Sequence, residues 1–428
     1  MSKGFTDVNQ TATSSSENLS QQKEFSANGN SLDSATRRQK RKRTLLVVGV
    51  VAGVVILALA LGLGLGLGRK HEITAPKYPS ENYALVEQYQ GTDFFNKFDY
   101  WSDADPTNGF TLYQLRANSQ YENYTYASST SAIIRPDTNA TATGVNSVRI
   151  QSTKNYTQGL FVLDLAHMPH GCGTWPAFWT CDTDNWPTHG EIDIMEGVNL
   201  NTHNQMTLHT SDGCTMKNVA RNETGAVLTK DCHSGAGATS GAGCGVNDTT
   251  HAALSYGAGF NANGGGFYAM DWRSTGIRVW FFPRTALPSD LQVLSDDPTS
   301  TAVPTMQNWG QAVANYPAGN CDIDSHFKNH KIIFDLTFCG DWAGAASSWN
   351  TTTCYDATTA PTCAKYMANS PSDLADAYFE IKSLNVYQYS GEGASVVGSE
   401  YYASSSTSAT VQVASSTART GAAASARS

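Results

Sequence analysis

The longest apolar run of the chain covers residues 45–67 (LLVVGVVAGVVILALALGLGLGL) and contains no charged side chain. Because a helix rises about 1.5 Å per residue, this run is long enough to cross a bilayer. Basic residues crowd positions 37–43 directly before it. This bias predicts a cytosolic N-terminus and a chain that continues on the far side of the membrane. The long polar lead favours an uncleaved signal anchor over a cleaved signal peptide.

After this run, short apolar stretches alternate with Gly, Asn, Asp and Pro. No stretch keeps the apolar period of a helix over three turns, whereas β-branched and aromatic residues recur in short runs, which is typical of strands. The pattern predicts an all-β fold, a sandwich or jelly roll with turn-rich connections. The expected strands are Ser147–Gln151, Gly159–Leu165, Gln205–Thr210, Phe267–Trp272, Ile277–Phe282, Lys331–Phe338 and Tyr378–Tyr389.

Composition divides the chain further. The N-terminal segment is rich in Ser, Asn, Gln and Thr and poor in aromatic residues, which indicates disorder, and the C-terminal segment is rich in Ser, Ala and Thr. The expected organisation is a disordered cytosolic segment (1–43), a transmembrane signal anchor (44–68), a stalk (69–80), one large folded domain (81–390) and a disordered tail (391–428).

Charge and cysteine usage agree with this topology. Residues 1–43 hold eight basic and four acidic residues, a net charge of +4, which leaves −13 for the rest of a chain whose total is −9. This balance excludes nucleic acid as a partner of the domain and is compatible with a neutral polysaccharide. All nine cysteines follow the apolar run without a C-x-x-C pair, which predicts disulfides in an oxidising compartment and one cysteine left over. Six N-x-S/T sequons lie on the same side, at Asn123, Asn139, Asn155, Asn222, Asn247 and Asn350.

Candidate chemistry lies in residues 190–197, GEIDIMEG, which place Glu191, Asp193 and Glu196 within six positions. In a regular strand Glu191 and Asp193 share one face and Glu196 points to the other. A β-bulge at Ile194 or Met195 would bring all three carboxylates to one face. Two carboxylates on one side of a sugar bond are what a retaining glycosidase needs, one to attack and one to protonate the leaving oxygen.

The residues before this strand suit a sugar-binding surface. Trp175, Trp179 and Trp186 offer flat aromatic faces, and Asp182 and Asn185 offer polar partners for hydroxyl groups. Each Trp could instead be part of the core. A further expectation is a disulfide between Cys172 and Cys181. His209, in the segment TLHT, is expected to bond an acid or a substrate hydroxyl, or else to be a satisfied core histidine.

These motifs resemble glycoside hydrolase family 16, in particular its fungal endo-1,3(4)-β-glucanases, or laminarinases. The likeness extends over residues 80–390 and includes FDLTFCGDWAG at 334–344. The resemblance implies a concanavalin-like β-jelly roll with a concave cleft, Glu191 as nucleophile, Glu196 as acid/base and Asp193 as their support. It also implies that Met195 is the extra residue of the laminarinase branch. The residues that it places along the glucan subsites are Arg149, Trp179, Asp182, Trp186, His209 and Trp342.

The resulting hypothesis is a membrane-anchored retaining endo-β-glucanase acting on 1,3- and mixed 1,3/1,4-linked β-glucan, with no cofactor and no metal. An ionised Asp193 would help to keep Glu196 protonated. Two alternatives stay open. The same site could pass the glycosyl group to another sugar, as in a cell-wall transglycosylase, or the domain could be a catalytically silent glucan-binding lectin.

Overall fold

The computed structural model describes residues 82–139, 141–369 and 374–389. The expected anchor at 45–67, the polar lead and the Ser/Ala-rich tail lie outside these residues. Within the described ranges, no helix has the length and apolar character needed to cross a membrane.

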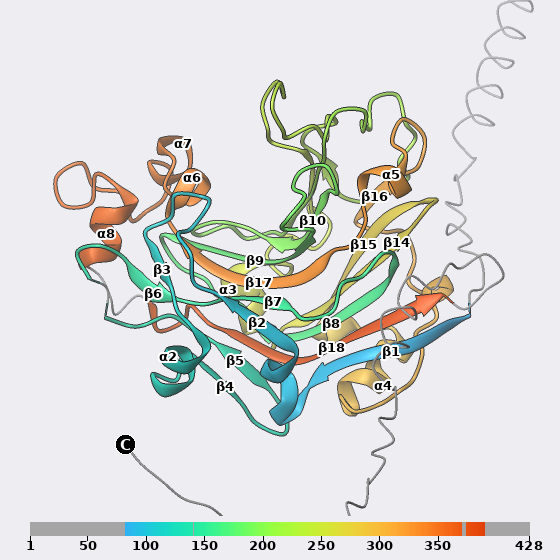
Figure 1. The fold of residues 1–428 in the computed structure, drawn as a ribbon, viewed down its shortest axis with the longest axis horizontal. Helices are drawn as coiled ribbons and strands as arrows, with labels where there is room; N and C mark the ends of the chain where they lie inside the picture. The colour runs from blue at the N-terminus through green and yellow to red at the C-terminus, as the bar shows by residue number, and fades with distance from the viewer. Residues whose placement is uncertain (1–81, 140, 370–373, 390–428) are drawn as a thin grey trace, which may run out of the picture. The chain divides into compact units, whose positions relative to one another are not determined.

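Two antiparallel sheets of eight strands each build the domain (Figure 1). In the back sheet, the long strand β18 pairs with β8 along one edge, while β1 and β5 share its other edge. The back sheet comprises β16 (Ala314–Pro317), β15 (Gly276–Pro283), β14 (Gly266–Arg273), β8 (Gly159–His167), β18 (Phe379–Tyr389), β5 (Ala132–Ile134), β4 (Thr125–Ala127) and β1 (Tyr83–Gln90).

The front sheet carries the acid-rich strand β10 near its middle, and Figure 1 shows its central strands curving beneath tall loops. Its order is β12 (Ala226–Val227), β13 (Cys244–Asn247), β11 (Gln205–His209), β10 (Glu191–Glu196), β9 (Thr174–Cys181), β17 (Lys331–Phe338), β7 (Arg149–Ser152) and β2 (Phe98–Trp101). A separate parallel pair joins β3 (Thr111–Tyr113) to β6 (Val145–Ser147).

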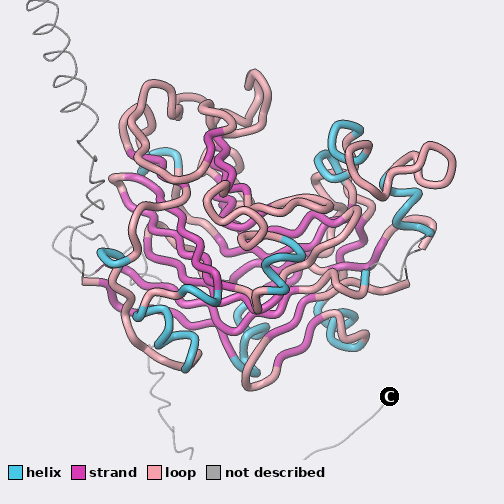
Figure 2. The backbone as a smooth tube through the Cα atoms, turned by 180° about the vertical axis from the view of Figure 1, so that it is seen from behind, coloured by secondary structure: helices cyan, strands magenta, loops and turns pink. Residues whose placement is uncertain are grey.

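The helices are short and lie in the connections between strands (Figure 2). None of the described helices exceeds the eight residues of α4, in keeping with the missing helical period. They are η1 (Gly91–Lys97), α2 (Arg116–Tyr121), α3 (Gly257–Ala262), η2 (Arg284–Ala286), α4 (Ser289–Asp296), η3 (Met306–Asn308), α5 (Ile323–His326), α6 (Gly340–Ala343), α7 (Ala346–Trp349) and α8 (Cys363–Asn369).

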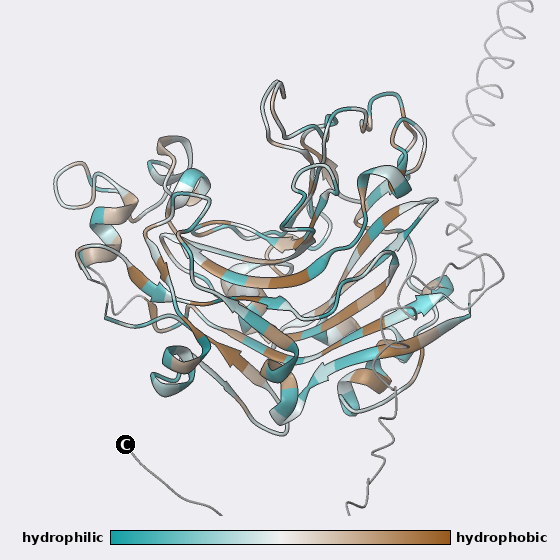
Figure 3. Ribbon diagram, in the orientation of Figure 1, coloured by the Kyte–Doolittle hydropathy of each residue, from teal (hydrophilic) through white to brown (hydrophobic). Residues whose placement is uncertain are grey.

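Aromatic side chains fill the space between the sheets. Phe178 of β9 stacks on Phe334 of β17 at 4.8 Å between ring centroids, and Phe334 meets Phe379 of β18 edge-on at 5.8 Å. Burying each such ring contributes about 1.5–3 kcal/mol to folding. Figure 3 shows the hydrophobic residues gathered along the central strands of both sheets.

A second apolar cluster covers the outer face of the back sheet. Leu160 and Val162 of β8 pack there with Leu291 of α4 and with Trp309, while Phe161 and Leu163 belong to the core between the sheets. Both faces of β8 are therefore buried. This explains why residues 159–163 (GLFVL) of β8 form a continuous apolar run and do not alternate.

The predicted strands are confirmed in that each one overlaps an observed strand. The segment Ser147–Gln151 is divided at Val148, with Ser147 in β6 and Arg149–Gln151 in β7. The expected disulfide between Cys172 and Cys181 is wrong. Cys172 bonds to Cys354, and the other pairs are Cys214–Cys321, Cys232–Cys244 and Cys339–Cys363, which leaves Cys181 as a buried free thiol. This prediction is wrong because Cys181 is the last residue of β9 and Cys172 lies before the first, so the extended strand holds the two cysteines apart.

Candidate active site

The register of β10 changes within the acid motif. Against β11, Asp193 pairs with Thr207 and Glu196 pairs with Gln205, so two residues of β10 stand opposite Met206 alone. Against β9, the pairing passes from Asp193 directly to Met195 and skips Ile194. The predicted β-bulge is thus confirmed, and Ile194 is the residue without a partner in β9.

Burial shows what the bulge achieves. Ile192, Ile194 and Met195 are all fully buried in the core between the sheets. Because two consecutive residues point into the core, Glu196 returns to the face that carries Glu191 and Asp193. Glu191 and Glu196 are half-buried and Asp193 is buried, so the three carboxyl groups lie on the open side of the front sheet.

The two glycines that bracket the motif allow close packing at its ends. Gly190 has a positive φ of 78°, and a Cβ there would lie 2.5 Å from the carbonyl oxygen of His326. A Cβ on Gly197 would lie 2.6 Å from the ring of Tyr256. A side chain at either position would displace the backbone that holds the acids.

Two tryptophans donate hydrogen bonds to the outer acids. Trp175 Nε1–H donates to Glu196 Oε1 at 2.8 Å, and Trp186 Nε1–H donates to Glu191 Oε2 at 2.6 Å. Trp186 is 47% exposed, so its ring lies at the open side of the site, as expected for a residue that meets substrate. The ring of Trp175 contacts that of Trp342 edge-on at 5.7 Å, which brings the predicted residue Trp342 to the same site.

Burial dominates the electrostatics of the inner carboxyl groups. Burial, followed by the negative charge of Asp193, raises the pKa of Glu196 well above its usual range. Burial, followed by the charge of Glu191, also raises the pKa of Asp193. An acid with a raised pKa keeps its proton, as a proton donor requires. For Asp193, burial and the charge and hydrogen bond of Glu191 favour the protonated form, which is the opposite direction from the ionised Asp193 expected from the sequence.

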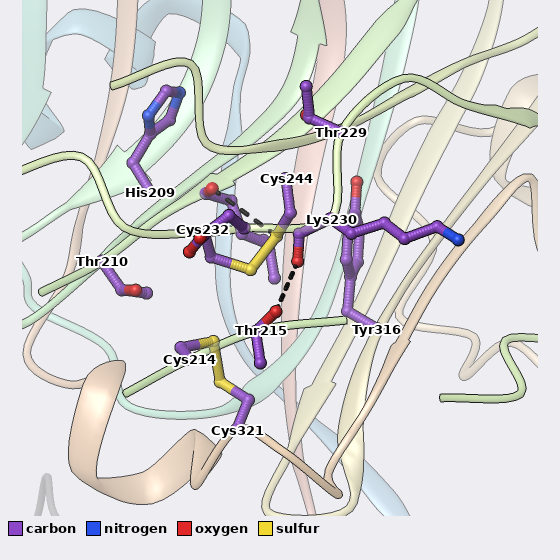
Figure 4. Close-up of a disulfide and its surroundings, with 12 residues drawn as sticks. His209, Thr210, Cys214, Thr215, Thr229, Lys230, Cys232, Cys244, Tyr316 and Cys321 are labelled. Carbon is purple, nitrogen blue, oxygen red and sulfur yellow. Dashed lines mark hydrogen bonds between the residues drawn. A yellow bond between two sulfur atoms is a disulfide. The ribbon is translucent and has the colours of Figure 1, made fainter. Parts of the chain in front are cut away.

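His209 lies beside this carboxyl pair. Its Nε2 is 3.3 Å from Asp193 Oδ2, and its Nδ1 is 2.6 Å from Ser234 Oγ. Ser234 follows Cys232, whose disulfide with Cys244 ties this loop to the edge of the front sheet (Figure 4). The structure thus places His209 with the acids and not in the core.

A second group of side chains extends the site across β9, β17, β7 and β2. The Arg149 guanidinium lies between the rings of Trp101 and Trp179, at 4.9 and 5.0 Å from their centroids. Trp179 Nε1–H donates to Asp335 Oδ1 at 2.7 Å. In the register, Trp101 pairs with Arg149 and Arg149 pairs with Asp335, so these residues form one row on the face of the acids.

Asp182 directly follows β9, in the loop that leads to β10. Its Oδ2 accepts hydrogen bonds from the side chains of His189, Asn185 and Asn329, and its Oδ1 accepts one from the backbone N–H of Asp184. Both oxygens are thus engaged, by partners in the loop between β9 and β10 and by Asn329, which lies just before β17. Asp182 acts on the site through this loop, which carries Trp186 over Glu191.

Asp335 and Trp101 were not predicted as site residues. Trp175 was expected on the sugar-binding surface or in the core, but its hydrogen bond to Glu196 was not predicted. Asp335 stands in the quoted stretch FDLTFCGDWAG, but only the pairing of β17 with β9 shows that it meets Trp179. Among the described residues, Glu191, Asp193 and His209 could also hold a cation, since their ligand atoms lie within 4.8 Å of one another.

A two-sheet sandwich with three carboxyl groups on one bulged strand, flanked by indole rings, defines a carbohydrate-cleaving type of site. A model of the XgeA-like catalytic domain of glycoside hydrolase family 16 matches residues 98–387. The chain belongs to this family and is a glycoside hydrolase.

Similar proteins support the assignment. A probable glycosidase of Schizosaccharomyces pombe is 46% identical over 316 residues, which cover 73% of this chain and 71% of that protein. A probable endo-1,3(4)-β-glucanase of Aspergillus niger is 39% identical over 345 residues, or 77% of this chain. The matched region makes up 43% of the A. niger protein, so the chain spans less than half of that relative.

Two solved structures share the fold at high identity. Laminarinase 16A from Phanerochaete chrysosporium, solved with β-glucans in its donor and acceptor sites, is 44% identical with a TM-score of 0.66, covering 72% of this chain and 99% of that one. An elongating family 16 β-1,3-glucosyltransferase is 39% identical with a TM-score of 0.63, covering 72% of this chain and 100% of that one.

Proposed function

We propose that the protein is a retaining endo-β-glucanase that hydrolyses 1,3-linked and mixed 1,3/1,4-linked β-glucans. The observation that carries the proposal is the bulge in β10, which sets Glu191 and Glu196 on one face with Asp193 between them. The laminarinase bound to β-glucans supports the choice of substrate.

In the proposed mechanism, Glu191 attacks the anomeric carbon while Glu196 gives its proton to the leaving oxygen, and a covalent glycosyl-enzyme forms. Glu196, now ionised, takes a proton from water, which attacks the same carbon and releases the sugar with retained configuration. Trp186 orients Glu191, Trp175 orients Glu196, and Asp193 holds the carboxyl group of Glu191 through a hydrogen bond.

A transglycosylase is the second candidate, because the same glycosyl-enzyme can react with a sugar hydroxyl in place of water. The similarity to an elongating β-1,3-glucosyltransferase favours this alternative. The complete set of acids speaks against a silent lectin, since binding alone does not require them.

The substrate test follows the products of laminarin, mixed-linkage glucan, cellulose and xylan over time. Short oligosaccharides from internal cuts of the first two, with a β-configured new reducing end, are expected, and cellulose should remain intact. Products longer than a short oligosaccharide donor would identify the transglycosylase, and binding without cleavage would identify the lectin.

The acid roles are tested by two variants. Glu191→Gln should fold and lose turnover on every substrate, because a neutral amide cannot trap the oxocarbenium-like centre. Glu196→Gln should lose laminarin cleavage but still form the glycosyl-enzyme from a substrate whose leaving group needs no proton. Substantial turnover by Glu191→Gln would contradict the assignment.

We further propose that residues 45–67 anchor the protein as a single-pass type II membrane protein with a lumenal or extracellular catalytic domain. Four disulfides and the exposure of five of the six sequon asparagines, all but Asn247, support this location. Resistance to alkaline carbonate extraction and a mobility shift with endoglycosidase are expected. A mature N-terminus near residue 70 would instead indicate cleavage.

A further inference from the structure

The bulge in β10 needs a support of its own. A bulge leaves some backbone N–H and carbonyl groups without their hydrogen-bond partners in the neighbouring strand, and a buried polar group without a partner destabilises the folded state. At the bulge, the carbonyl of Ile194 and the N–H of Glu196 lie on either side of Met195, and both bond to the side chain of Asn204. Asn204 Nδ2–H donates to the Ile194 carbonyl at 2.8 Å, and Asn204 Oδ1 accepts from the Glu196 N–H at 2.9 Å.

Asn204 is itself held firmly. It is fully buried, its backbone N–H donates to Ser255 Oγ at 3.1 Å, and its carbonyl accepts from the Asp248 N–H at 2.9 Å. Both partners come from the segment that follows β13. The amide group of Asn204 is therefore fixed at its backbone end and at its polar end.

The chemistry of the two contacts selects an amide. The N–H of Glu196 needs an acceptor and the carbonyl of Ile194 needs a donor. A peptide group of a neighbouring strand would present both, and so does the side-chain amide of Asn204. A carboxylate would set an oxygen against the Ile194 carbonyl, and an alanine would leave both backbone groups without these partners. At the bulge, a single residue of β11 stands opposite two residues of β10. The side chain of Asn204 supplies the hydrogen bonds that β11 does not provide there.

We propose that Asn204 is a positioning residue that holds the catalytic carboxyl group of Glu196 on the cleft face by clamping the bulge. The inference rests on the proposed role of Glu196 as acid/base. Glu196 is then fixed at two points, its backbone N–H by Asn204 and its carboxyl oxygen by Trp175. Displacement of a catalytic group by about 1 Å can cost on the order of 100-fold in rate.

The test compares two substrates that differ in their need for the acid. Laminarin has a poor leaving group and needs the proton of Glu196, whereas 2,4-dinitrophenyl β-laminaribioside does not. The ratio kcat/KM reports the first chemical step for both. In the full-length protein, Asn204→Ala should lower kcat/KM for laminarin by roughly 10-fold or more and that for the aryl glycoside by less than about 3-fold.

A matched control separates positioning from stability. Asn261 of α3 makes the same pair of bonds elsewhere, accepting from the N–H and donating to the carbonyl of Met168, each at 3.0 Å. Asn261→Ala should lower the midpoint of thermal unfolding without changing the preference between the two substrates. Asn204→Asp keeps the acceptor for the Glu196 N–H and serves as the second variant if Asn204→Ala does not fold. Its loss on laminarin should again exceed its loss on the aryl glycoside.

The outcomes are distinguishable. Equal losses on both substrates in the Asn204 variants, beside normal cleavage by the wild type, would overturn the role of Asn204 alone. A wild-type protein that cleaves neither substrate would overturn the proposed function and this role with it.

Discussion

Trp175 shows how one side chain can set both the position and the acidity of a catalytic group. Its N–H donates to Glu196 Oε1, and a hydrogen bond to a carboxylate favours the ionised form. This bond opposes the burial and the charge of Asp193, which raise the pKa of Glu196. The acid strength of Glu196 is therefore the result of opposing contacts made by separate strands.

Trp175→Phe should move the alkaline limb of the pH–rate profile to higher pH. The variant keeps an aromatic ring but loses the N–H, so the ionised form of Glu196 is less stable and its pKa rises further. The acid then stays protonated at a higher pH, although kcat should fall because the carboxyl group is less well oriented. The profile of kcat/KM for laminarin measures this shift.

Trp342→Phe is the matched control for this experiment. Trp342 contacts the ring of Trp175 but makes no hydrogen bond to Glu196 that the structure describes. Its replacement should leave the alkaline limb where it is in the wild type. A limb that moves equally in both variants, or in neither, would mean that the N–H of Trp175 does not set the acidity of Glu196.

Single-residue contacts were the least predictable part of the site. The acids could be identified from the spacing in GEIDIMEG, because the strand period alone restricts which of them share a face. Trp101, Asp335 and Asn204 carry no such local signal. The roles of Trp101 and Asp335 depend on which strands become neighbours, since β2 and β17 come from distant parts of the sequence. The role of Asn204 depends on the geometry of the bulge.

Among the elements, β10 is the one whose irregularity the chemistry needs. Deleting Met195 should leave the plain alternation Glu-Ile-Asp-Ile-Glu, which keeps the three acids on one face but removes the bulge that Asn204 supports. Turnover should therefore fall by roughly 10-fold or more because Glu196 is displaced, while far-ultraviolet circular dichroism remains that of a β-rich protein. Activity towards laminarin and the dichroism spectrum are the two measurements.

Met195→Ala separates the register from the side chain. The shorter residue keeps the chain length and therefore the bulge, but it leaves a cavity in the core that costs about 2–5 kcal/mol of stability. We expect this variant to unfold at a lower temperature and to remain active. Activity retained after the deletion would show that the site works without the extra residue.

The strands could be predicted where the sequence shows the two-residue period of a strand or a short run rich in β-branched and aromatic residues. Asp182 and Cys181 show the limit of this reasoning. Both belong to the segment that the sequence assigned to sugar binding and to a disulfide. The carboxylate of Asp182 bonds instead to its own loop and to Asn329, and the thiol of Cys181 lies buried in β9. Loop geometry and disulfide pairing depend on packing that no local pattern encodes.

For the catalytic domain as a whole, His330 links stability to pH. It is fully buried between Thr180 and the carbonyl of His189, and burial lowers its pKa from 6.5 to about 4. Above pH 6.5 neither state binds the proton. As the pH falls towards 4, the unfolded chain takes up a proton that the folded domain refuses, so stability decreases by roughly 1 kcal/mol per pH unit.

His330→Gln should remove this part of the pH dependence. Thermal unfolding at pH 7 and pH 4.5 should show a smaller loss of stability in the variant than in the wild type. The buried Asp271, whose pKa is raised to about 6, acts in the opposite direction, but it does so equally in both proteins. An equal loss in the two proteins would contradict the assignment to His330.

The position of β18 in the back sheet has a consequence for how the protein is made. This strand is the last described segment of the chain, yet it separates β8 from β1 and β5 and bonds to all three. As the polypeptide is synthesised from its N-terminus, β1 has no partner and one edge of β8 stays open until residue 389 has emerged. Such an open edge is a template for wrong pairing, so we expect the nascent domain to depend on chaperones until synthesis of its final strand is complete.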